Sequence, residues 1–493
     1  MNIQYKMSYT LSSTFRVLTG FMLAANLLNA AHHAAVGSGD LTAHAAPDRP
    51  NIILMMADDL GWGDVQCFNP ATPIKTPQLD AMAAAGVQFN RFYSSSPVCS
   101  PTRGSSLTGR HPFRFGIYYA NKGHLKVEEL TLAELLQKQG YATGHFGKWH
   151  LGTLTTEIKD ANRGKPRNTK DFSPPWQNGF DVCFSTESKV PTWDPMLKPK
   201  KANVKGWDYI KDRSTAVPYG THYWNEQGEV VTDNLEGDDS RVIMDRVVPF
   251  VEQAAQEDKP FFAVVWFHTP HLPVVAGPEH AAMYSEYDSF EMNYYGCVTA
   301  MDDQVGRLRA ALEKAGIAEN TMLWFGSDNG PEGSVKSPGT AAHFKGRKRS
   351  LNEGGVRVSG ILDWPARVKP GTVTEFPAVT SDYLPTILDA VDIELADERM
   401  HDGISLLPML AGEQTERLKP IGFESQGQLA WTTQQYKLYS KNGGAKWQLY
   451  DLLSDPSEVN DLSATHPELV QQMSKDLAQW RASCKQSDEG GDY

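Results

Sequence analysis

The chain has 493 residues, of which 40% are hydrophobic and 22% are charged. This is enough for one large core and a smaller second domain. The formal net charge of -12 argues against nucleic acid or an anionic membrane surface as the main partner. If the substrate is anionic, positive charge must be concentrated at its binding site.

Residues 1–46 have the features of an export signal. Lys6 and Arg16 accompany the apolar run 17–28, and no acidic residue occurs before Asp40. Ala43-His-Ala45 resembles a small-residue cleavage site. We therefore expect a periplasmic or secreted protein. The apolar run is short and broken for a membrane span, an uncleaved anchor is the alternative, and no other segment approaches a span.

Apolar runs that alternate with helical stretches predict a sheet of parallel strands buried on both faces. The predicted strands cover residues 51–57, 141–147, 261–267 and 321–327. The predicted helices cover residues 76–86, 131–140, about 242–255 and about 294–315. The second begins with a Thr-x-x-Glu capping box, and Pro249 is expected to kink the third. This alternation predicts the α/β class, with a mixed, largely parallel central sheet flanked by helices.

Two segments depart from the alternation. Residues 153–239 are polar and have little periodicity, so they either line a substrate cleft or form surface loop. After residue 416, short strands and a helix at 466–483 predict a small antiparallel sheet with a helix packed on it. We therefore expect an export signal at 1–46, a catalytic domain at 47–415 and a C-terminal α+β subdomain at 416–493.

Two pairs of polar residues stand directly after predicted strands. Asp58 and Asp59 follow the first, and Asp328 and Asn329 follow the last. Open α/β sheets place their sites at the carboxyl ends of the strands, so these side chains should converge. Oxygen-only ligands favour Ca²⁺ or Mg²⁺ over zinc or copper. Helix capping is the alternative for each pair, whereas Asp302-Asp303 lies within a helical pattern and is interpreted as a solvated or capping pair.

Cys99 is the most unusual of five widely spaced cysteines. It follows a polar loop and opens a helix with Pro101 near its start, so a nucleophile there would experience the positive end of the helix dipole. Arg103, one turn later, faces the same region. An inert, half-buried thiol is the alternative. The other four cysteines allow up to two disulfides, which the sequence does not pair.

Several motifs occur in a fixed order along the chain. They are Ala57-Asp-Asp-Leu-Gly-Trp-Gly-Asp64, Cys99-Ser-Pro-Thr-Arg103 continuing to Arg110, Gly147-Lys-Trp-His-Leu-Gly152, Phe267-His-Thr-Pro-His271, Ser327-Asp-Asn-Gly330, Glu353-Gly-Gly-Val-Arg357 and Leu449-Tyr-Asp-Leu-Leu-Ser-Asp-Pro456. Together they resemble the type I, formylglycine-dependent sulfatases of the alkaline phosphatase superfamily. The resemblance extends from about residue 50 to 462 and implies that superfamily's fold.

The resemblance implies a metal centre with a modified cysteine. Cys99 would be oxidised to formylglycine by a maturation enzyme, and its hydrate would be the nucleophile. One Ca²⁺ would be held by Asp58, Asp59, modified Cys99, Asp328 and Asn329. The implied activity is hydrolysis of an O-sulfate ester, with a sulfated small molecule or saccharide as the substrate.

Five further residues receive catalytic roles from the resemblance: Arg103, Lys148, His150, His268 and Lys348. The cations would clamp the sulfate as the S–O bond lengthens. His268 would protonate the departing alcohol. His150 would accept the proton that lets the hemiacetal collapse and release sulfate.

The assignment of Lys348 depends on spacing within a basic run. The family's lysine stands five residues before the Glu of Glu-Gly-Gly, and Lys348 rather than Lys345 keeps that distance to Glu353. Arg347 and Arg349 replace the glycines usual on either side. They indicate either an extra cationic contact to a multiply sulfated substrate or a solvated basic patch.

Residues of the irregular excursion are candidates for holding a sugar ring: Trp193, Asp194, His222, Tyr223 and Trp224. His111, His222 and His271 are weaker candidates for the rim of the cleft. Two other functions remain open. A phosphoester or phosphonate hydrolase would share most of these residues, and an inactive binder of sulfated glycans would fit a chain whose Cys99 is never oxidised.

Overall fold

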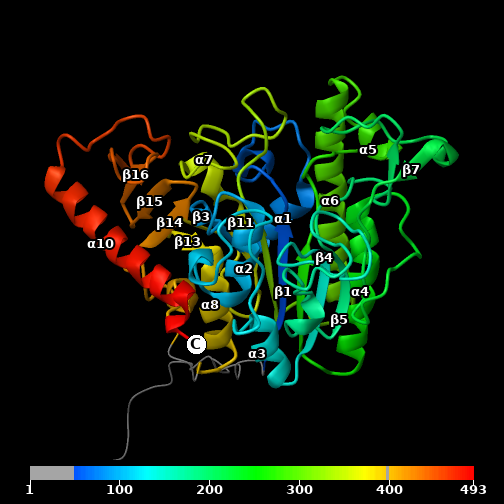
Figure 1. Cartoon of the computed structure of the whole chain (residues 1–493), viewed down its shortest axis with the longest axis horizontal. Helices are drawn as coiled ribbons and strands as arrows, with labels where there is room; N and C mark the ends of the chain where they lie inside the picture. Colours follow the sequence, from blue (N-terminus) through cyan, green and yellow to red (C-terminus); the bar gives the residue numbers. More distant parts are fainter. Residues whose placement is uncertain (1–48, 396–398) are drawn as a thin grey trace, which may run out of the picture. The chain divides into compact units, whose positions relative to one another are not determined.

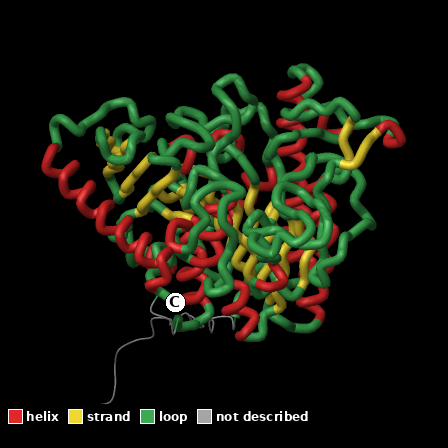
Figure 2. Tube along the Cα trace, viewed as in Figure 1, coloured by secondary structure: helices red, strands yellow, loops and turns green. Residues whose placement is uncertain are grey.

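The computed structural model describes residues 49–395 and 399–493, so the predicted export signal lies outside the described residues. An eight-stranded sheet has the strand order β12-β2-β11-β9-β1-β8-β4-β5 (Figures 1 and 2). From β9 to β5 all neighbouring strands are parallel, whereas β11 is antiparallel to both of its neighbours. In chain order the strands are β1 Asn51–Ala57, β2 Val87–Phe89, β4 Ala142–Lys148, β5 Val182–Thr186, β8 Phe261–Trp266, β9 Thr321–Ser327, β11 Gly360–Asp363 and β12 Thr372–Thr374.

The apolar strands are buried because helices cover both faces of the sheet (Figure 1). In β1, Ile53 and Met55 face one hydrophobic cluster, whereas Ile52 and Leu54 face another, as the alternation of a strand requires. The first cluster is completed by α1 Pro77–Ala85, α4 Asp239–Gln256 and α6 Ser289–Lys314. The second is completed by α2 Cys99–Thr108, α3 Leu132–Lys138 and α8 Tyr383–Ala390. The predicted fold class is confirmed.

The predicted helices are present, and local chemistry explains their starts. Thr131 and Glu134 form the capping box of α3, with the Thr131 side chain accepting from the Glu134 backbone and the Glu134 carboxylate accepting from the Thr131 backbone. α4 begins earlier than expected because Asp238 caps it, and Pro249 lies inside it. Asp302 is buried and accepts hydrogen bonds of 2.9 and 2.8 Å from the backbone of Gln78 and Leu79, so it caps α1 from a different helix.

The excursion at 153–239 contains little regular structure beyond β5, the antiparallel pair β6 Leu197–Pro199 and β7 Ala216–Pro218, and two short 3₁₀ turns. Its buried polar contacts nevertheless hold it in place. Asp160 is fully buried and accepts from the His222 backbone and the indole of Trp224, at 2.8 and 3.0 Å. The excursion is therefore packed against the core.

The C-terminal segment forms the predicted antiparallel sheet and helix (Figure 1). Its elements are β14 Ile421–Ser425, β15 Gln428–Thr432, β16 Tyr436–Ser440, β17 Gln448–Asp451 and α10 Pro467–Gln486. One face of the sheet, including Ala430 and Tyr439, packs on Tyr93 and Val379 of the small sheet β10-β3-β13 (β3 Phe92–Tyr93, β10 Arg357–Val358, β13 Ala378–Val379). The other face packs on α10. The domain boundary at residue 416 stays a prediction.

The remaining helices are short: α5 Pro278–Ala282, α7 Glu353–Val356 and α9 Leu407–Leu410. All five cysteines are free thiols, so the structure contains neither of the disulfides that the sequence allows. Across residues 49–395 and 399–493, every helix is too short or too polar to cross a membrane.

Candidate active site

The two polar pairs meet at the carboxyl edge of the parallel sheet. β1 and β9 are adjacent, with Ala57 in register with Ser327, so the residues that follow them emerge side by side. The Asp59 backbone donates to Asp328 Oδ1 at 3.1 Å, and Asn329 Nδ2 donates to Asp59 Oδ1 at 2.8 Å. The structure therefore brings together segments that are about 270 residues apart, as strand-end placement predicts.

Three cations surround the three buried carboxylates. Lys148 Nζ, at the end of β4, lies 2.6 Å from Asp58 Oδ2. Lys348 Nζ lies 2.6 Å from Asp59 Oδ1. Arg103 donates to Asp328 Oδ2 from Nε and Nη2, at 3.1 and 2.6 Å. Each carboxylate thus has its own cation, which leaves a strongly polar centre in a buried setting.

The two lysines of the basic run 345–349 point to different parts of the structure. Lys348 reaches the carboxylates, whereas Lys345 Nζ lies 3.4 Å from the Tyr450 hydroxyl and 3.3 Å from the Glu458 carbonyl. The spacing argument therefore selected the lysine that lies in the site.

The donor set fits a hard cation. Asp58, Asp59, Cys99 and His271 place one ligand atom each within 4.8 Å of one another. The Oδ1 of Asn329 is buried and has no hydrogen-bond donor. Burial and the neighbouring charge of Asp58 raise the pKa of Asp328 to about 7. A bound cation would contact the Asn329 carbonyl oxygen and offset the repulsion between the Asp58 and Asp328 carboxylates. Carboxylate and amide oxygens are ligands that suit Ca²⁺ or Mg²⁺.

Cys99 is the first residue of α2, which follows the extended residue Val98. Its Sγ lies 3.5 Å from Asp58 Oδ1 and 3.9 Å from Asp59 Oδ1. Burial and the charge of Asp328 raise the pKa of the Cys99 thiol. The unmodified side chain is therefore a weak nucleophile, because the thiolate is the reactive form.

His150 follows β4 and has one ring nitrogen available. Its Nε2 lies 2.8 Å from the Oδ1 of Asn121, which also accepts from Asn162. Nε2 therefore carries the proton, and the buried Nδ1 has no partner. Burial and the charge of Lys148 lower the pKa of His150 well below its usual value. The neutral ring thus presents a free acceptor atom beside the site.

The two histidines of the Phe267–His271 motif occupy different environments. His268 is fully buried, with Nε2 at 2.7 Å from Thr186 Oγ1 and Nδ1 at 2.8 Å from Asp239 Oδ2. Both ring nitrogens are engaged, so His268 has no atom free to meet a substrate. His271 instead points Nε2 at Asp59 Oδ2, 3.7 Å away, while its Nδ1 donates to the Leu272 carbonyl. Of the two, His271, which the sequence suggested only as a residue of the rim, is the histidine that faces the carboxylates. The catalytic role expected for His268 stays a prediction.

Two residues near the site had no distinguishing signal in the sequence. Asn121, in an irregular loop, holds His150. Lys189 follows β5, and burial and the charges of Lys148 and Lys348 lower the pKa of its ammonium. Among the described residues, Lys189 has no ion-pair partner within 4 Å, so its charge is available to an anionic substrate.

The candidate sugar-binding residues of the excursion all make contacts within the fold, and Asp194, Tyr223 and Trp224 are buried. Tyr223 is fully buried and donates to Asp239, and Trp224 is 4% exposed and donates to Asp160. The His222 Nδ1 lies 2.9 Å from the same Asp160. The Trp193 ring packs over Gly277 so closely that a Cβ there would collide with it. Tyr223 and Trp224 are therefore enclosed in the fold, and sugar binding by the partly exposed Trp193 and His222 stays a prediction.

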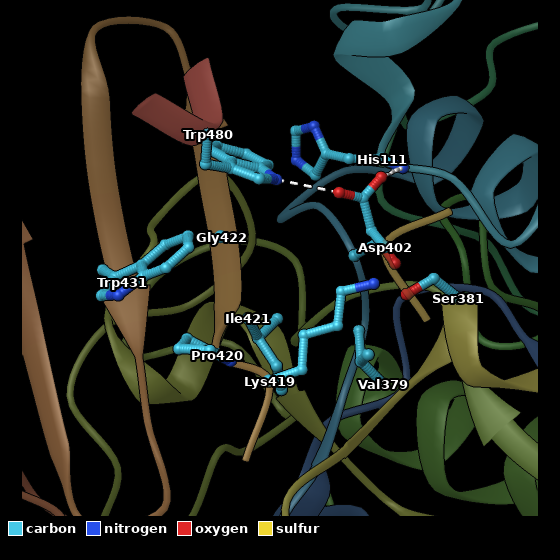
Figure 3. A pocket seen from close by; sticks show the side chains of 11 residues that line it. His111, Val379, Ser381, Asp402, Lys419, Pro420, Ile421, Gly422, Trp431 and Trp480 are labelled. Atoms are coloured by element: carbon cyan, nitrogen blue, oxygen red, sulfur yellow. Dashed lines mark hydrogen bonds between the residues drawn. The ribbon is translucent and has the colours of Figure 1, made fainter. Parts of the chain in front are cut away.

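His111 also lies away from the carboxylate cluster. It lines a small pocket beneath the C-terminal sheet, together with Asp402, Lys419 and Trp480 (Figure 3). The Trp480 indole donates to Asp402 at 2.8 Å. Burial lowers the pKa of His111 to about 3, as expected for a neutral, enclosed ring.

Comparison with known proteins identifies the class to which this fold and site belong. Residues 50–393 match the sulfatase family, and residues 342–483 match the C-terminal region of N-sulphoglucosamine sulphohydrolase. N-acetylgalactosamine-6-sulfatase from Rattus norvegicus is 31% identical over 83% of this chain and 74% of its own length. Arylsulfatase A from Homo sapiens is 31% identical over 87% of this chain and 82% of its own.

Solved structures with the same fold include an oligosaccharide complex and a phosphonate hydrolase. Ps i-CgsB in complex with k-i-k-neocarrahexaose superposes with a TM-score of 0.75 at 27% identity, covering 89% of this chain and 94% of that one. The phosphonate monoester hydrolase of Agrobacterium radiobacter shares the fold, with a TM-score of 0.64 at 18% identity over 88% of this chain and 96% of its own. The chain belongs to the sulfatase family, within the alkaline phosphatase superfamily. It is a sulfuric ester hydrolase.

Proposed function

We propose that this sulfatase is an exported enzyme that removes O-sulfate groups from carbohydrates, using a formylglycine derived from Cys99 and one bound Ca²⁺. The main support is the convergence of Cys99 with three buried carboxylates and three cations at one edge of the sheet. Export is supported by the sequence of residues 1–46. Because Cys99 is only 1% exposed, a maturation enzyme would have to act before folding is complete.

The proposed metal ligands are Asp58, Asp59, modified Cys99, Asp328 and Asn329. When bound, Ca²⁺ would act as a Lewis acid toward a sulfate oxygen, and formylglycine would supply the nucleophile. The protein's own cations would orient the anionic ester, since Lys148 and Lys348 flank the carboxylates. Arg103 would hold Asp328 in place through its paired hydrogen bonds, and its charge opposes the rise that burial causes in the pKa of this carboxyl.

The two histidines would handle protons on opposite sides of the reaction. His271 would deliver a proton from Nε2 to the departing alcohol oxygen, because this nitrogen faces the cluster. Its Nδ1 already donates to the Leu272 carbonyl, so Nε2 carries a proton only in the imidazolium form. Burial lowers the pKa of His271 to about 4, so the negative charge of the bound ester would have to stabilise that form. His150 would accept a proton at its unpartnered Nδ1, and Asn121 would hold the required tautomer. His268 would support the site indirectly by anchoring Asp239 and Thr186.

A carbohydrate substrate is supported by the relatives. The N-acetylgalactosamine-6-sulfatases act on a sulfated sugar by name, and Ps i-CgsB was solved with an oligosaccharide. A panel of defined sulfated saccharides would test this proposal by measuring released sulfate. Turnover of aryl sulfate without turnover of any saccharide would overturn the carbohydrate assignment.

Two measurements test the chemistry. Mass spectrometry of the peptide containing Cys99 should show the aldehyde in place of the thiol, and an unmodified thiol in active enzyme would refute the proposed nucleophile. Aryl sulfate should be hydrolysed faster than the matching aryl phosphate. Dominant phosphate hydrolysis would favour the phosphoesterase alternative, whose fold is shared by the phosphonate hydrolase.

A further inference from the structure

A second concave region lies beside the site, between the segment 345–352 and the C-terminal sheet. Its volume is about 510 Å³, within the roughly 300–1,000 Å³ typical of ligand pockets. Lys348 adjoins both regions, since it is among the residues that line this pocket and its Nζ contacts Asp59. A molecule held at the carboxylate cluster could therefore extend into the pocket.

The wall of this pocket is strongly cationic. Its lining includes Lys345, Arg347, Lys348, Arg349 and Lys441, and no carboxylate residue is among the described residues that line it. The chain as a whole carries a net charge of -12, so this concentration of positive charge opposes the general trend. Such a patch attracts anions and raises their local concentration.

Much of this charge has no carboxylate partner. Arg349 is paired with Glu332 at 2.6 Å, and Lys348 is paired with Asp59. Lys345 has no carboxylate partner, but its Nζ contacts the ring and hydroxyl of Tyr450 and the Glu458 carbonyl, so it adds charge without a free ammonium. Among the described residues Lys441 has no carboxylate within 4 Å, so its ammonium is available to a ligand.

A buried donor in the same wall also lacks an acceptor. Asn352 lines the pocket and is 6% exposed, and its Nδ2 has no hydrogen-bond acceptor. Its Oδ1 already accepts from Ser350, so the amide orientation leaves the donor unused. Arg347 is different, because its Nη2 donates to the carbonyls of Glu332 and Gly339, which do not line the pocket. An unpaired buried donor is costly, and a ligand oxyanion would satisfy Nδ2 of Asn352.

We propose that this pocket is a subsite for an anionic sugar unit, bearing a sulfate or carboxylate group, next to the unit whose sulfate is removed. This inference rests on the proposed carbohydrate sulfatase activity. Lys345 and Lys441 contribute charge, and Asn352 contributes a directed donor. The enzyme would accordingly prefer oligosaccharides with anionic neighbours over singly sulfated ones.

The test compares three substrates: 4-nitrophenyl sulfate, a sulfated disaccharide with a neutral neighbouring sugar, and the same disaccharide with an anionic neighbour. The wild-type enzyme should show about tenfold or higher kcat/KM for the anionic neighbour over the neutral one. Lys441→Glu and Asn352→Asp should remove this preference, mainly through KM, without changing turnover of 4-nitrophenyl sulfate. Lys441→Arg should retain it.

Lys446→Glu is the matched control, because it makes the same charge change at an exposed lysine outside the pocket. Equal kcat/KM for the two disaccharides in the wild type, or equal losses in Lys441→Glu and Lys446→Glu, would overturn the proposed subsite. If neither disaccharide is hydrolysed, the proposed function fails separately. In that case the subsite can be tested by calorimetry, which measures binding of the anionic disaccharide to the Cys99→Ser variant. Adding Lys441→Glu to this variant should weaken the affinity for the disaccharide about tenfold. An unchanged affinity would refute the subsite.

Discussion

Replacing His271 by glutamine separates a proton donor from a structural histidine. His271 Nε2 faces Asp59 at 3.7 Å, and no other hydrogen-bond partner occupies this atom among the described residues. General acid catalysis contributes about 100- to 10,000-fold, equivalent to about 3–5 kcal/mol of transition-state stabilisation. We expect His271→Gln to lower kcat/KM by that factor for sulfated sugars, because their alcohols are poor leaving groups. The loss of kcat/KM should be much smaller for 4-nitrophenyl sulfate, because its phenol leaves readily.

His268→Gln is the matched comparison from the same motif. It removes hydrogen bonds to Thr186 and Asp239 in a fully buried setting, at about 1–3 kcal/mol for each partner left unsatisfied. This variant should unfold at lower urea concentration, and its folded fraction should lose activity on both substrates to a similar extent. The assay is kcat/KM for each substrate, alongside equilibrium unfolding. The assignment of His271 as the proton donor would be refuted if His271→Gln lost the same activity on both substrates. It would also be refuted if His268→Gln lost much more activity on sulfated sugars than on 4-nitrophenyl sulfate.

Three further predictions concern the metal and the stability of the fold. Ca²⁺ added to chelator-treated protein should raise the unfolding free energy by about 2.7 kcal/mol at a hundredfold excess over its Kd, because a cation offsets the repulsion among three buried carboxylates. Lys437→Met should cost about 3–5 kcal/mol in urea unfolding, since it removes the cation 3.0 Å from the buried Glu458 and leaves Glu353, 2.9 Å away, with only the more distant Arg357 at 3.5 Å. Thr131→Ala should cost about 1 kcal/mol by breaking the capping box of α3.

Each of these predictions has its own control. Calorimetry with Asp58→Asn should show a much smaller Ca²⁺ effect, and an undiminished one would place the ion elsewhere. The exposed Lys446→Met should change stability by no more than about 0.5 kcal/mol, so a loss equal to that of Lys437→Met would count against a buried ion pair. Thr131→Ser keeps the hydroxyl and should remain close to the wild type, unlike the alanine variant.

Local pattern was sufficient to predict the architecture and most of the polar cluster. Runs such as 51–57 are apolar on both faces, which only a doubly covered strand tolerates, and polar pairs follow these runs immediately. Parallel strands end at one edge, so strand direction predicts Asp58 and Asp328 at the same edge of the sheet, whereas the adjacency of β1 and β9 that sets them side by side is seen only in the structure. The same reasoning did not predict the direction of the two histidines after β8, where His268 turns inward to Asp239 and His271 faces the site.

The amino-acid sequence by itself determined the class of protein, since hydrophobic periodicity and ordered motifs are properties of neighbouring residues. Only the tertiary structure decided which side chains share a space. It placed Lys348 at the carboxylates and Lys345 against the C-terminal sheet, and it buried Trp224 on Asp160. It also assembled a cationic pocket from segments about ninety residues apart, around Asn352 and Lys441. The physical reason is that side-chain direction and burial depend on packing between distant segments, which no local pattern records.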